Sequence, residues 1–297
     1  MTSQDEKQPD HFGYVAAFLG PALWGLFPIF YVLLADYPAI EIVAHRSLWA
    51  FILVFALYAL TGKLSHIAQL MRPSKQLANM IFAALMIAVN WTVFVYAVGE
   101  VRVIEASFGY FIYPLFAVGA SMLFLGEKLD MRGKIALALS IAGVCIKGWS
   151  LGFIPDISLI LAISFSLYAV VRKQITIDAL DGFFIETILI VPFAIAFLLV
   201  HMTYGGHLFF DGEMRGFILA VCCGLVTTIP LFLFLRGNKA MPLSLTAFIF
   251  YINPTLQLLC GIWFFGEMFS TKDLMAFGCI WAGLIVQFAR RPKAIKP

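Results

Sequence analysis

Apolar runs long enough to cross a lipid bilayer recur along the whole chain. The hydrocarbon core of a membrane requires about 20 mostly apolar residues per helix. Ten such runs cover residues 12–34, 38–61, 77–98, 103–125, 131–149, 154–171, 182–201, 216–235, 242–265 and 272–289. The chain is 62% hydrophobic and 12% charged, which is about half the charged share of a typical soluble domain. We therefore expect an all-α integral membrane protein with ten transmembrane helices.

The segments between these runs exclude several other kinds of protein. The longest connectors, residues 62–76 and 201–215, are too short to form a soluble domain such as a nucleotide-driven motor. The net charge of +3 is nearly balanced, so the sequence does not indicate a protein that binds nucleic acid. All five cysteines lie in apolar runs and match no metal-site spacing, so neither a metal nor another cofactor is expected.

Lysine and arginine residues gather on alternate connectors. With the amino terminus inside, fifteen of the 20 lie in segments assigned to the cytoplasm and four lie outside. Arg46, the remaining one, lies within the second run. Because cytoplasmic loops are enriched in lysine and arginine, this bias predicts a multi-pass protein with both termini in the cytoplasm.

The two halves of the chain repeat at an offset of 140 residues. Residues 108–127 and 248–267 share six identities without a gap, among them Pro114 with Pro254 and Glu127 with Glu267. The repeat predicts two units, residues 12–149 and 154–290, with five spans each. Because five is odd, the second unit would be inverted in the membrane relative to the first, as in many secondary transporters.

The repeated proline and glycine residues suggest where helices are interrupted or end. Pro114 and Pro254 would interrupt the fourth and ninth helices, and matched interruptions of this kind often mark a substrate site. The alternative is that each proline simply bends its helix. The Gly126–Glu127 and Gly266–Glu267 pairs are typical of a helix end followed by an acid at the start of the next helix.

Arg46 is a charged residue inside an otherwise apolar span. It lies about eight residues from the outer end of its helix, or roughly 12 Å deep at 1.5 Å per residue. Such a charge normally faces the protein interior or a watery cavity. The repeat places Glu186 at the equivalent position, so we expect an Arg46–Glu186 pair. Arg46 could attract an anionic substrate or change partners during transport, or it could fix helix packing.

Three further ionisable residues could couple transport to protons. His45 titrates near neutral pH, and Glu41 lies one turn before it on the same helix face. Glu105 begins the fourth helix and Glu186 begins the seventh. The structural alternatives are a contact at the membrane rim for His45 and a favourable interaction with the helix dipole for each acid.

Polar and aromatic side chains gather near the expected middle of the membrane. They predict a substrate path, although single residues of these types also form hydrogen bonds between helices. Aromatic walls with few polar groups suit a small amphipathic molecule. The predicted path comprises Arg46, Asn90, Trp91, Tyr110, Tyr113, Thr227, Thr228, Tyr251 and Asn253.

Several short motifs resemble the RarD group in the EamA branch of the drug/metabolite transporter superfamily. The first half contains LWG, AHRSLW, NWTVFVYAV and EASFGYFIYPL, and the second half contains SFSLYAVVRK, IETILIVP, GLVTTIPL and YINPT. The resemblance covers residues 12–290. It implies ten helices in a five-plus-five inverted arrangement and small-molecule transport across the bacterial inner membrane. It also links this group to chloramphenicol phenotypes.

The favoured function is a secondary transporter that exports a small amphipathic metabolite or drug by alternating access. Its partners would be this substrate and the lipid bilayer, and the sequence indicates no particular oligomeric state. Import and sugar-nucleotide exchange remain open. An intramembrane metalloprotease would need a pattern such as H-E-x-x-H, which the five histidines do not form. A channel would favour rings of like polar groups, so we expect neither an enzyme nor a channel.

Overall fold

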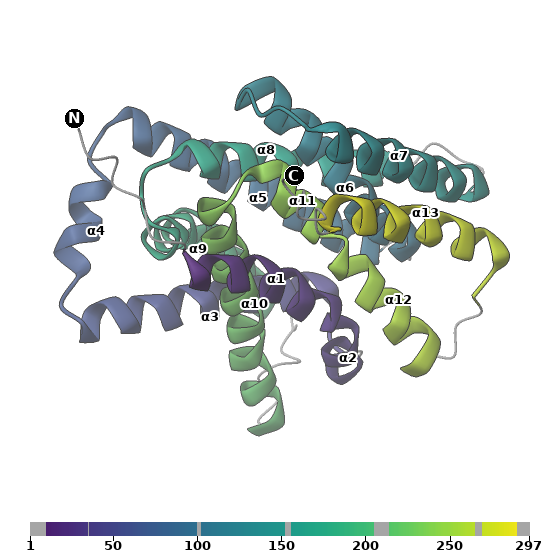
Figure 1. Cartoon of the computed structure of the whole chain (residues 1–297). Helices are drawn as coiled ribbons and strands as arrows, with labels where there is room; N and C mark the ends of the chain where they lie inside the picture. Colours follow the sequence, from purple (N-terminus) through teal and green to yellow (C-terminus); the bar gives the residue numbers. More distant parts are fainter. Residues whose placement is uncertain are drawn as a thin grey trace, which may run out of the picture.

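The computed structural model of the chain is a bundle of α-helices (Figure 1). It describes residues 10–34, 36–99, 102–151, 156–204, 214–264 and 269–289. Every regular element in these ranges is helical. The elements are α1 (His11–Gly25), α2 (Phe27–Tyr31), the 3-10 helix η1 (Val32–Leu34), α3 (Ala39–Leu60), α4 (Leu64–Leu70), α5 (Lys75–Gly99), α6 (Val103–Phe124), α7 (Met131–Leu151), α8 (Asp156–Gln174), α9 (Ala179–Thr203), α10 (Met214–Ala240), α11 (Leu243–Ile249), α12 (Ile252–Phe264) and α13 (Thr271–Phe288).

Each of the ten apolar runs contains a helix or a broken series of helices. Residues 12–34 form α1, α2 and η1, and residues 242–265 form α11 and α12. Within the described residues, six spans are both long and apolar enough to cross a membrane, and a seventh is bent by 41° after α1. Helices α7, α8 and α13 have sufficient length but are less apolar. The all-helical fold is therefore confirmed, and the ten-span arrangement stays a prediction.

Helix contacts follow a pattern that is preserved when the two halves are exchanged. Helix α1 packs on α10, and their counterparts by the 140-residue offset, α8 and α5, pack on each other. In the same way α6 packs on α8, and α12 packs on α1. The counterparts α7 and α13 lie side by side (Figure 1), as do α3 and α9. The halves thus share one packed interior.

Small residues allow α10 to approach its neighbours closely. A Cβ atom added to Gly237 would lie 2.4 Å from the Cα atom of Ala17 in α1. A Cβ atom added to Gly224 would lie 2.5 Å from the Cβ atom of Trp49 in α3. Membrane helices commonly associate through small residues because close backbone approach increases van der Waals contact. These two glycines fix α10 between α1 and α3.

An aromatic cluster fills the centre of the bundle. The rings of Tyr113 and Phe250 lie 4.5 Å apart, and those of Phe165 and Phe234 lie 5.2 Å apart, measured between centroids. Trp24 packs against three members of the cluster. Since both halves contribute rings, this cluster joins them and forms a solid floor for any cavity next to it.

The two matched prolines have different effects on their helices. Helix α6 continues through Pro114, contrary to the predicted interruption. The chain does break at residues 250–251, and Pro254 occupies the first turn of α12. A first-turn proline loses no helical hydrogen bond. Pro114 lies in the helix interior, where tight packing of α6 on α8 maintains the helix despite the lost amide donor.

Candidate functional site

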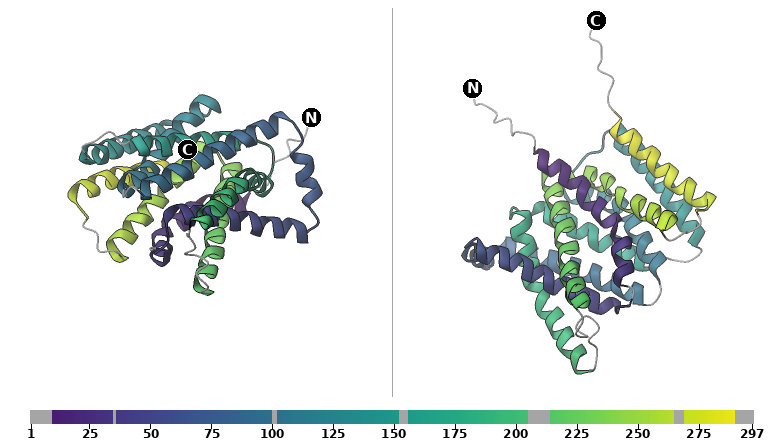
Figure 2. Two further views of the ribbon diagram at one scale, coloured as in Figure 1. Left: turned by 180° about the vertical axis from the view of Figure 1, so that it is seen from behind. Right: turned by 90° about the horizontal axis from the view of Figure 1, so that it is seen from below.

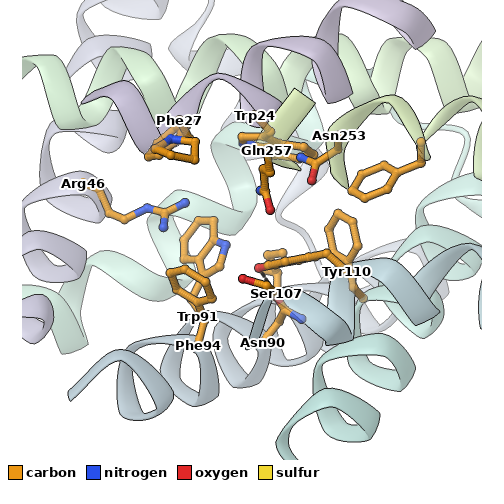
Figure 3. Close-up of a pocket in the computed structure, with 14 residues that line it drawn as sticks. Trp24, Phe27, Arg46, Asn90, Trp91, Phe94, Ser107, Tyr110, Asn253 and Gln257 are labelled. Carbon is orange, nitrogen blue, oxygen red and sulfur yellow. Dashed lines mark hydrogen bonds between the residues drawn. The ribbon is translucent and has the colours of Figure 1, made fainter. Parts of the chain in front are cut away.

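A cavity of about 350 Å³ lies next to the aromatic cluster, between the two halves of the chain. Its walls come from α1, α2, α3, α5 and α6 of the first half, and from α8, α12 and Phe250 of the second half (Figure 3). Most of the lining is aromatic or aliphatic. The lining residues are Trp24, Phe27, Pro28, Arg46, Ile87, Asn90, Trp91, Phe94, Ser107, Tyr110, Phe165, Phe250, Asn253 and Gln257.

Arg46 supplies a positive charge to this cavity. The residue is only 9% exposed, and its Nε atom donates a hydrogen bond of 3.0 Å to the Thr227 hydroxyl. The guanidinium carbon lies 4.7 Å from the centre of the Trp91 ring, within cation–π range. Figure 3 shows the guanidinium group pointing into the space between Phe27 and Trp91. Thr227 therefore contacts one edge of the guanidinium group and Trp91 contacts one of its faces. The terminal nitrogens point toward the cavity.

Uncharged polar groups lie on the other walls. The Asn90 amide donates hydrogen bonds to the Leu161 carbonyl at 2.9 Å and to the Ser164 hydroxyl at 3.1 Å. The Tyr110 hydroxyl donates to the Asn90 amide oxygen at 3.4 Å. Asn253 and Gln257 project from α12 toward the same space (Figure 3). These groups could orient a ligand by hydrogen bonds within the aromatic walls.

The structure brings together five of the nine residues in the predicted substrate path, namely Arg46, Asn90, Trp91, Tyr110 and Asn253. Thr227 lies behind Arg46 and holds it. Tyr113 and Tyr251 are buried at 0% and 1% exposure in the packed core. Thr228 is not among the described lining residues.

Sequence reasoning missed several lining residues that helical spacing could have identified. Phe94 follows Asn90 by four residues, Gln257 follows Asn253 by four, and Ser107 precedes Tyr110 by three. Residues at these spacings share one face of a helix. No such signal indicated Trp24 and Phe27, because the break between α1 and α2 turns them toward the cavity.

The expected Arg46–Glu186 pair does not form. Glu186 instead forms an ion pair with Arg172, whose Nε lies 3.2 Å from Oε1, and each of these side chains is 1% exposed. The Tyr168 hydroxyl donates to Glu186 Oε2 at 3.0 Å. Positions related by an inverted repeat are equivalent without being neighbours, so the offset gave no information about contact.

His45, another candidate proton carrier, is not among the described residues that line the cavity. His45 is buried in α3, with Nε2 at 3.8 Å from Glu41 Oε1. His201 lies at the same distance from the other oxygen of Glu41. Glu105 belongs to α6, but its side chain lies outside the described residues. Within the described ranges, no cluster of three or more His, Cys, Asp or Glu residues could hold a metal ion.

The Gly126–Glu127 pair ends α6 as expected, with Gly126 at a φ of 66°. Its acid does not serve the next helix, however. Glu127 accepts hydrogen bonds from the backbone amides of Leu243 and Ser244, at 2.7 and 2.9 Å, where α11 begins. The Ser244 hydroxyl adds a third bond of 2.6 Å. Glu267, the counterpart of Glu127, lies outside the described residues.

Comparison with known proteins gives a consistent result over the whole chain. The EamA-like transporter family matches twice, over residues 11–148 and 156–289. The chain is 35% identical to the uncharacterized transporter YojE of Bacillus subtilis, covering 89% of each protein. It is 33% identical to the protein RarD of Escherichia coli, covering 95% of each. The chloramphenicol-sensitive protein RarD of Pseudomonas aeruginosa is 27% identical, covering 92% of each.

A solved structure supports the fold independently. A protein of known crystal structure superposes with a TM-score of 0.71 at 17% sequence identity, covering 93% of this chain and 97% of the other. Together with the apolar helices, these relatives indicate a multi-pass protein of the bacterial inner membrane. The chain belongs to the EamA-like transporter family and is a RarD-like membrane transporter of the drug/metabolite superfamily.

Proposed function

We propose that this protein is a secondary transporter that exports a small amphipathic molecule by alternating access, with the cavity of Figure 3 as its substrate site. The observation that carries the proposal is the position of the cavity between the two halves, with walls from both. Rocking one half against the other would change access to such a site. The aromatic lining with a few polar groups suits an amphipathic molecule.

Contacts at the helix ends support the ten-span topology with both termini in the cytoplasm. Ion pairs and hydrogen bonds join residues that this topology places on the same side of the membrane. On the inner side, Arg236 pairs with Asp10 at 2.6 Å and Gln76 bonds to Thr176 at 2.6 Å. On the outer side, Lys147 pairs with Asp273 at 2.5 Å. Figure 2 shows the first turn of α1 and the last turn of α13 on the same side of the molecule.

In this topology the cavity lies in the outer half of the membrane. Phe94 and Ser107 lie toward the outer ends of α5 and α6, whereas Phe165 and Phe250 form the inner floor. Below that floor, Glu127 ties the end of α6 to the start of α11. Within this proposed topology, we assign the conformation to an outward-facing state that is closed on the cytoplasmic side.

Transport by purified protein in liposomes would test the proposal. A panel of radiolabelled amphipathic compounds should include chloramphenicol, since a relative is named for sensitivity to it. We expect protein-dependent movement of at least one compound across the liposome membrane. The assay should be run separately with and without an imposed pH gradient. Trp91→Ala should abolish it, while Trp149→Ala, at an exposed position outside the cavity, should not.

Equal losses in the two tryptophan variants would show that the cavity is not the substrate site. Movement no faster than in protein-free liposomes for the whole panel would contradict the transport proposal. Selective labelling of the molecules inserted in each orientation would establish the direction, and preferential inward movement in the cellular orientation would contradict export.

A further inference from the structure

Arg46 carries the only formal charge among the described residues that line the cavity. Starting from the proposed transport function, we infer that the substrate is a monoanion with a flat apolar or aromatic body, and that its carboxylate binds Arg46. The inference depends on the charge balance of the cavity, the free edge of the guanidinium group and the composition of the opposite walls.

No carboxylate of the described chain neutralises Arg46. Its hydrogen bond goes to the uncharged hydroxyl of Thr227, and its nearest ring is Trp91. Glu41, five residues earlier in α3, lies against His45 and His201, while Glu186 pairs with Arg172. A cation buried in a membrane protein normally has a partner of opposite charge or water. A bound anion would supply that partner.

The geometry of Arg46 favours a planar anion. Thr227 occupies the Nε edge, and the described residues accept no hydrogen bond from Nη1 or Nη2. Figure 3 shows these terminal nitrogens directed into the cavity. The guanidinium plane matches a carboxylate with two parallel hydrogen bonds. Because Thr227 and Trp91 already restrict the side chain, little rotational freedom would be lost on binding.

The lining of the cavity disfavours substrates with other charges. A dianion such as a phosphate monoester would bring two negative charges to a single cation, leaving one buried without a partner. A cation would meet Arg46 without a described carboxylate in the lining to offset the repulsion. Trp24, Phe27 and Phe94 offer apolar faces, and Asn253 and Gln257 offer neutral hydrogen bonds. A single carboxylate on a ring-sized apolar body meets all of these conditions.

The charge selectivity of the cavity can be measured without knowing the substrate. Ser107 is an exposed lining residue, so Ser107→Cys should react with small thiosulfonates. We expect an anionic reagent to react faster, relative to a cationic one, than it does with a free thiol in solution. Adding Arg46→Gln should lower the anionic-to-cationic rate ratio about tenfold, since a focused charge can raise local counter-ion concentration by at least this factor. The chain that retains Ser107 gives the background from the native cysteines.

Arg132→Gln is the matched control for loss of one positive charge. Arg132 lies at the start of α7, where it donates to the Ala289 carbonyl, and it is outside the cavity lining. It should leave the rate ratio unchanged. An Arg46→Gln variant that retains the original ratio would overturn the inference, as would a thiol at residue 107 that reacts with neither reagent.

Ligands that share a phenylalanine body but carry different charges provide the second test. N-acetylphenylalanine is an anion, its amide is neutral, and phenylalanine amide, used below the pKa of its amine, is a cation. Calorimetry on purified protein should give the order anion, neutral, cation. Arg46→Gln should weaken binding of the anion by about 10-fold to 100-fold, the worth of a hydrogen bond to a charged group, while leaving the neutral amide unchanged. Wild-type protein that shows no preference for the anion, or no saturable binding of it, would overturn the inference.

Conservative variants separate recognition from folding. Arg46→Lys keeps the charge without the planar pair of donors, so it should retain part of the anion preference and fold normally. Thr227→Val should weaken anion binding several-fold by releasing Nε. Thr187→Val is the matched control, because that buried hydroxyl bonds to the Phe184 carbonyl in its own helix. Equal effects of the two threonine variants would contradict a positioning role for Thr227.

Transport of the same ligands distinguishes the two proposals. Equal transport of the anion and the neutral amide by the wild-type protein would overturn the anion inference and leave the transporter proposal intact. If neither Trp91→Ala nor Arg46→Gln altered transport, the cavity would not be the substrate site. The site assignment in the transporter proposal and the anion inference would then both be wrong.

Discussion

At the scale of single residues, the Arg172–Glu186 pair is the most deeply buried charge interaction in the described chain. Each side chain is 1% exposed, the Arg172 guanidinium also donates to the Ala179 carbonyl at 3.1 Å, and Tyr168 supports the carboxylate. The Arg172 guanidinium also packs directly against the backbone of α9, because a Cβ atom added to Gly182 would lie 2.0 Å from Arg172 Nη1. The pair locks the C-terminal end of α8 to α9.

Removal of one member of this pair should be strongly destabilising. Glu186→Gln would leave Arg172 without a counter-charge, and we expect a loss of about 3–5 kcal/mol, the usual cost of an uncompensated buried charge. Tyr168→Phe should cost about 1.5–3 kcal/mol, the usual contribution of a hydrogen bond to a charged group. Unfolding of detergent-solubilised protein would measure both.

Double variants identify the true partner of Glu186. Arg172→Met with Glu186→Leu should be less damaging than the sum of the single changes, because neither charge is left behind. The losses from Arg46→Gln and Glu186→Gln should simply add. A coupled effect in the second combination, with additivity in the first, would contradict the contacts of the structure.

At the scale of elements, the halves are joined by both close helix packing and a carboxylate at a helix start. Helix α10 approaches α1 at Gly237, where there is no room for a side chain. Glu127 binds the first amides of α11, where the helix dipole favours negative charge. These contacts involve elements far apart in sequence, so each is sensitive to a shift of one half against the other.

Two glycine-to-alanine substitutions should have clearly different effects on stability. Gly237→Ala would place a Cβ atom 2.4 Å from the backbone of α1 and should destabilise the protein by about 1–3 kcal/mol, as overpacking does. At Gly278 in α13, no atom lies within 4 Å of the added Cβ, so Gly278→Ala should be neutral or stabilising by up to about 1 kcal/mol. Similar melting temperatures for the two variants would refute the close contact at Gly237.

Glu127→Gln should weaken closure on the proposed inner side. Hydrogen bonds to a charged group contribute about 1.5–3 kcal/mol, so their loss should raise the inward-open population and slow labelling of Ser107→Cys from the outside. Asp130→Asn is the matched control, because Asp130 caps its own helix by accepting from the Gly133 amide at 2.8 Å. It should leave labelling unchanged; an equal slowing in both variants would rule out a gate function for Glu127.

At the scale of the whole molecule, the preserved contact pattern supports a two-fold relation between the halves. The cavity, the aromatic floor and the Glu127 contacts follow one another from the proposed outer side to the inner side. By the repeat, Glu267 would take the role of Glu127 on the opposite side in the alternate state.

The topology predicts that both ends of the chain are cytoplasmic. A reporter protein that is fluorescent or active only in the cytoplasm should give a signal when it is fused to either end of the chain. Opposite locations for the two ends would require an odd number of spans and would remove the inverted-repeat argument. A fusion within residues 205–213, between α9 and α10, should report the periplasm and serves as the control.

The sequence by itself determined that the protein lies in a membrane, which segments are helical and to which family the chain belongs. These properties depend on local hydrophobic runs and short motifs. It also identified Arg46 and Asn90 as residues of the cavity, since a polar group within an apolar span must face the protein interior. Helical spacing around Asn90 and Asn253 could have added Phe94 and Gln257.

Only the tertiary structure decided which side chains meet. Glu186 lies against Arg172 rather than Arg46, and Glu127 caps a helix more than a hundred residues away. Tyr113, although next to the repeated proline, packs into the core rather than lining the cavity. A helical pattern specifies the face on which a residue lies but not the helix opposite that face, and pairing depends on how all the helices pack together.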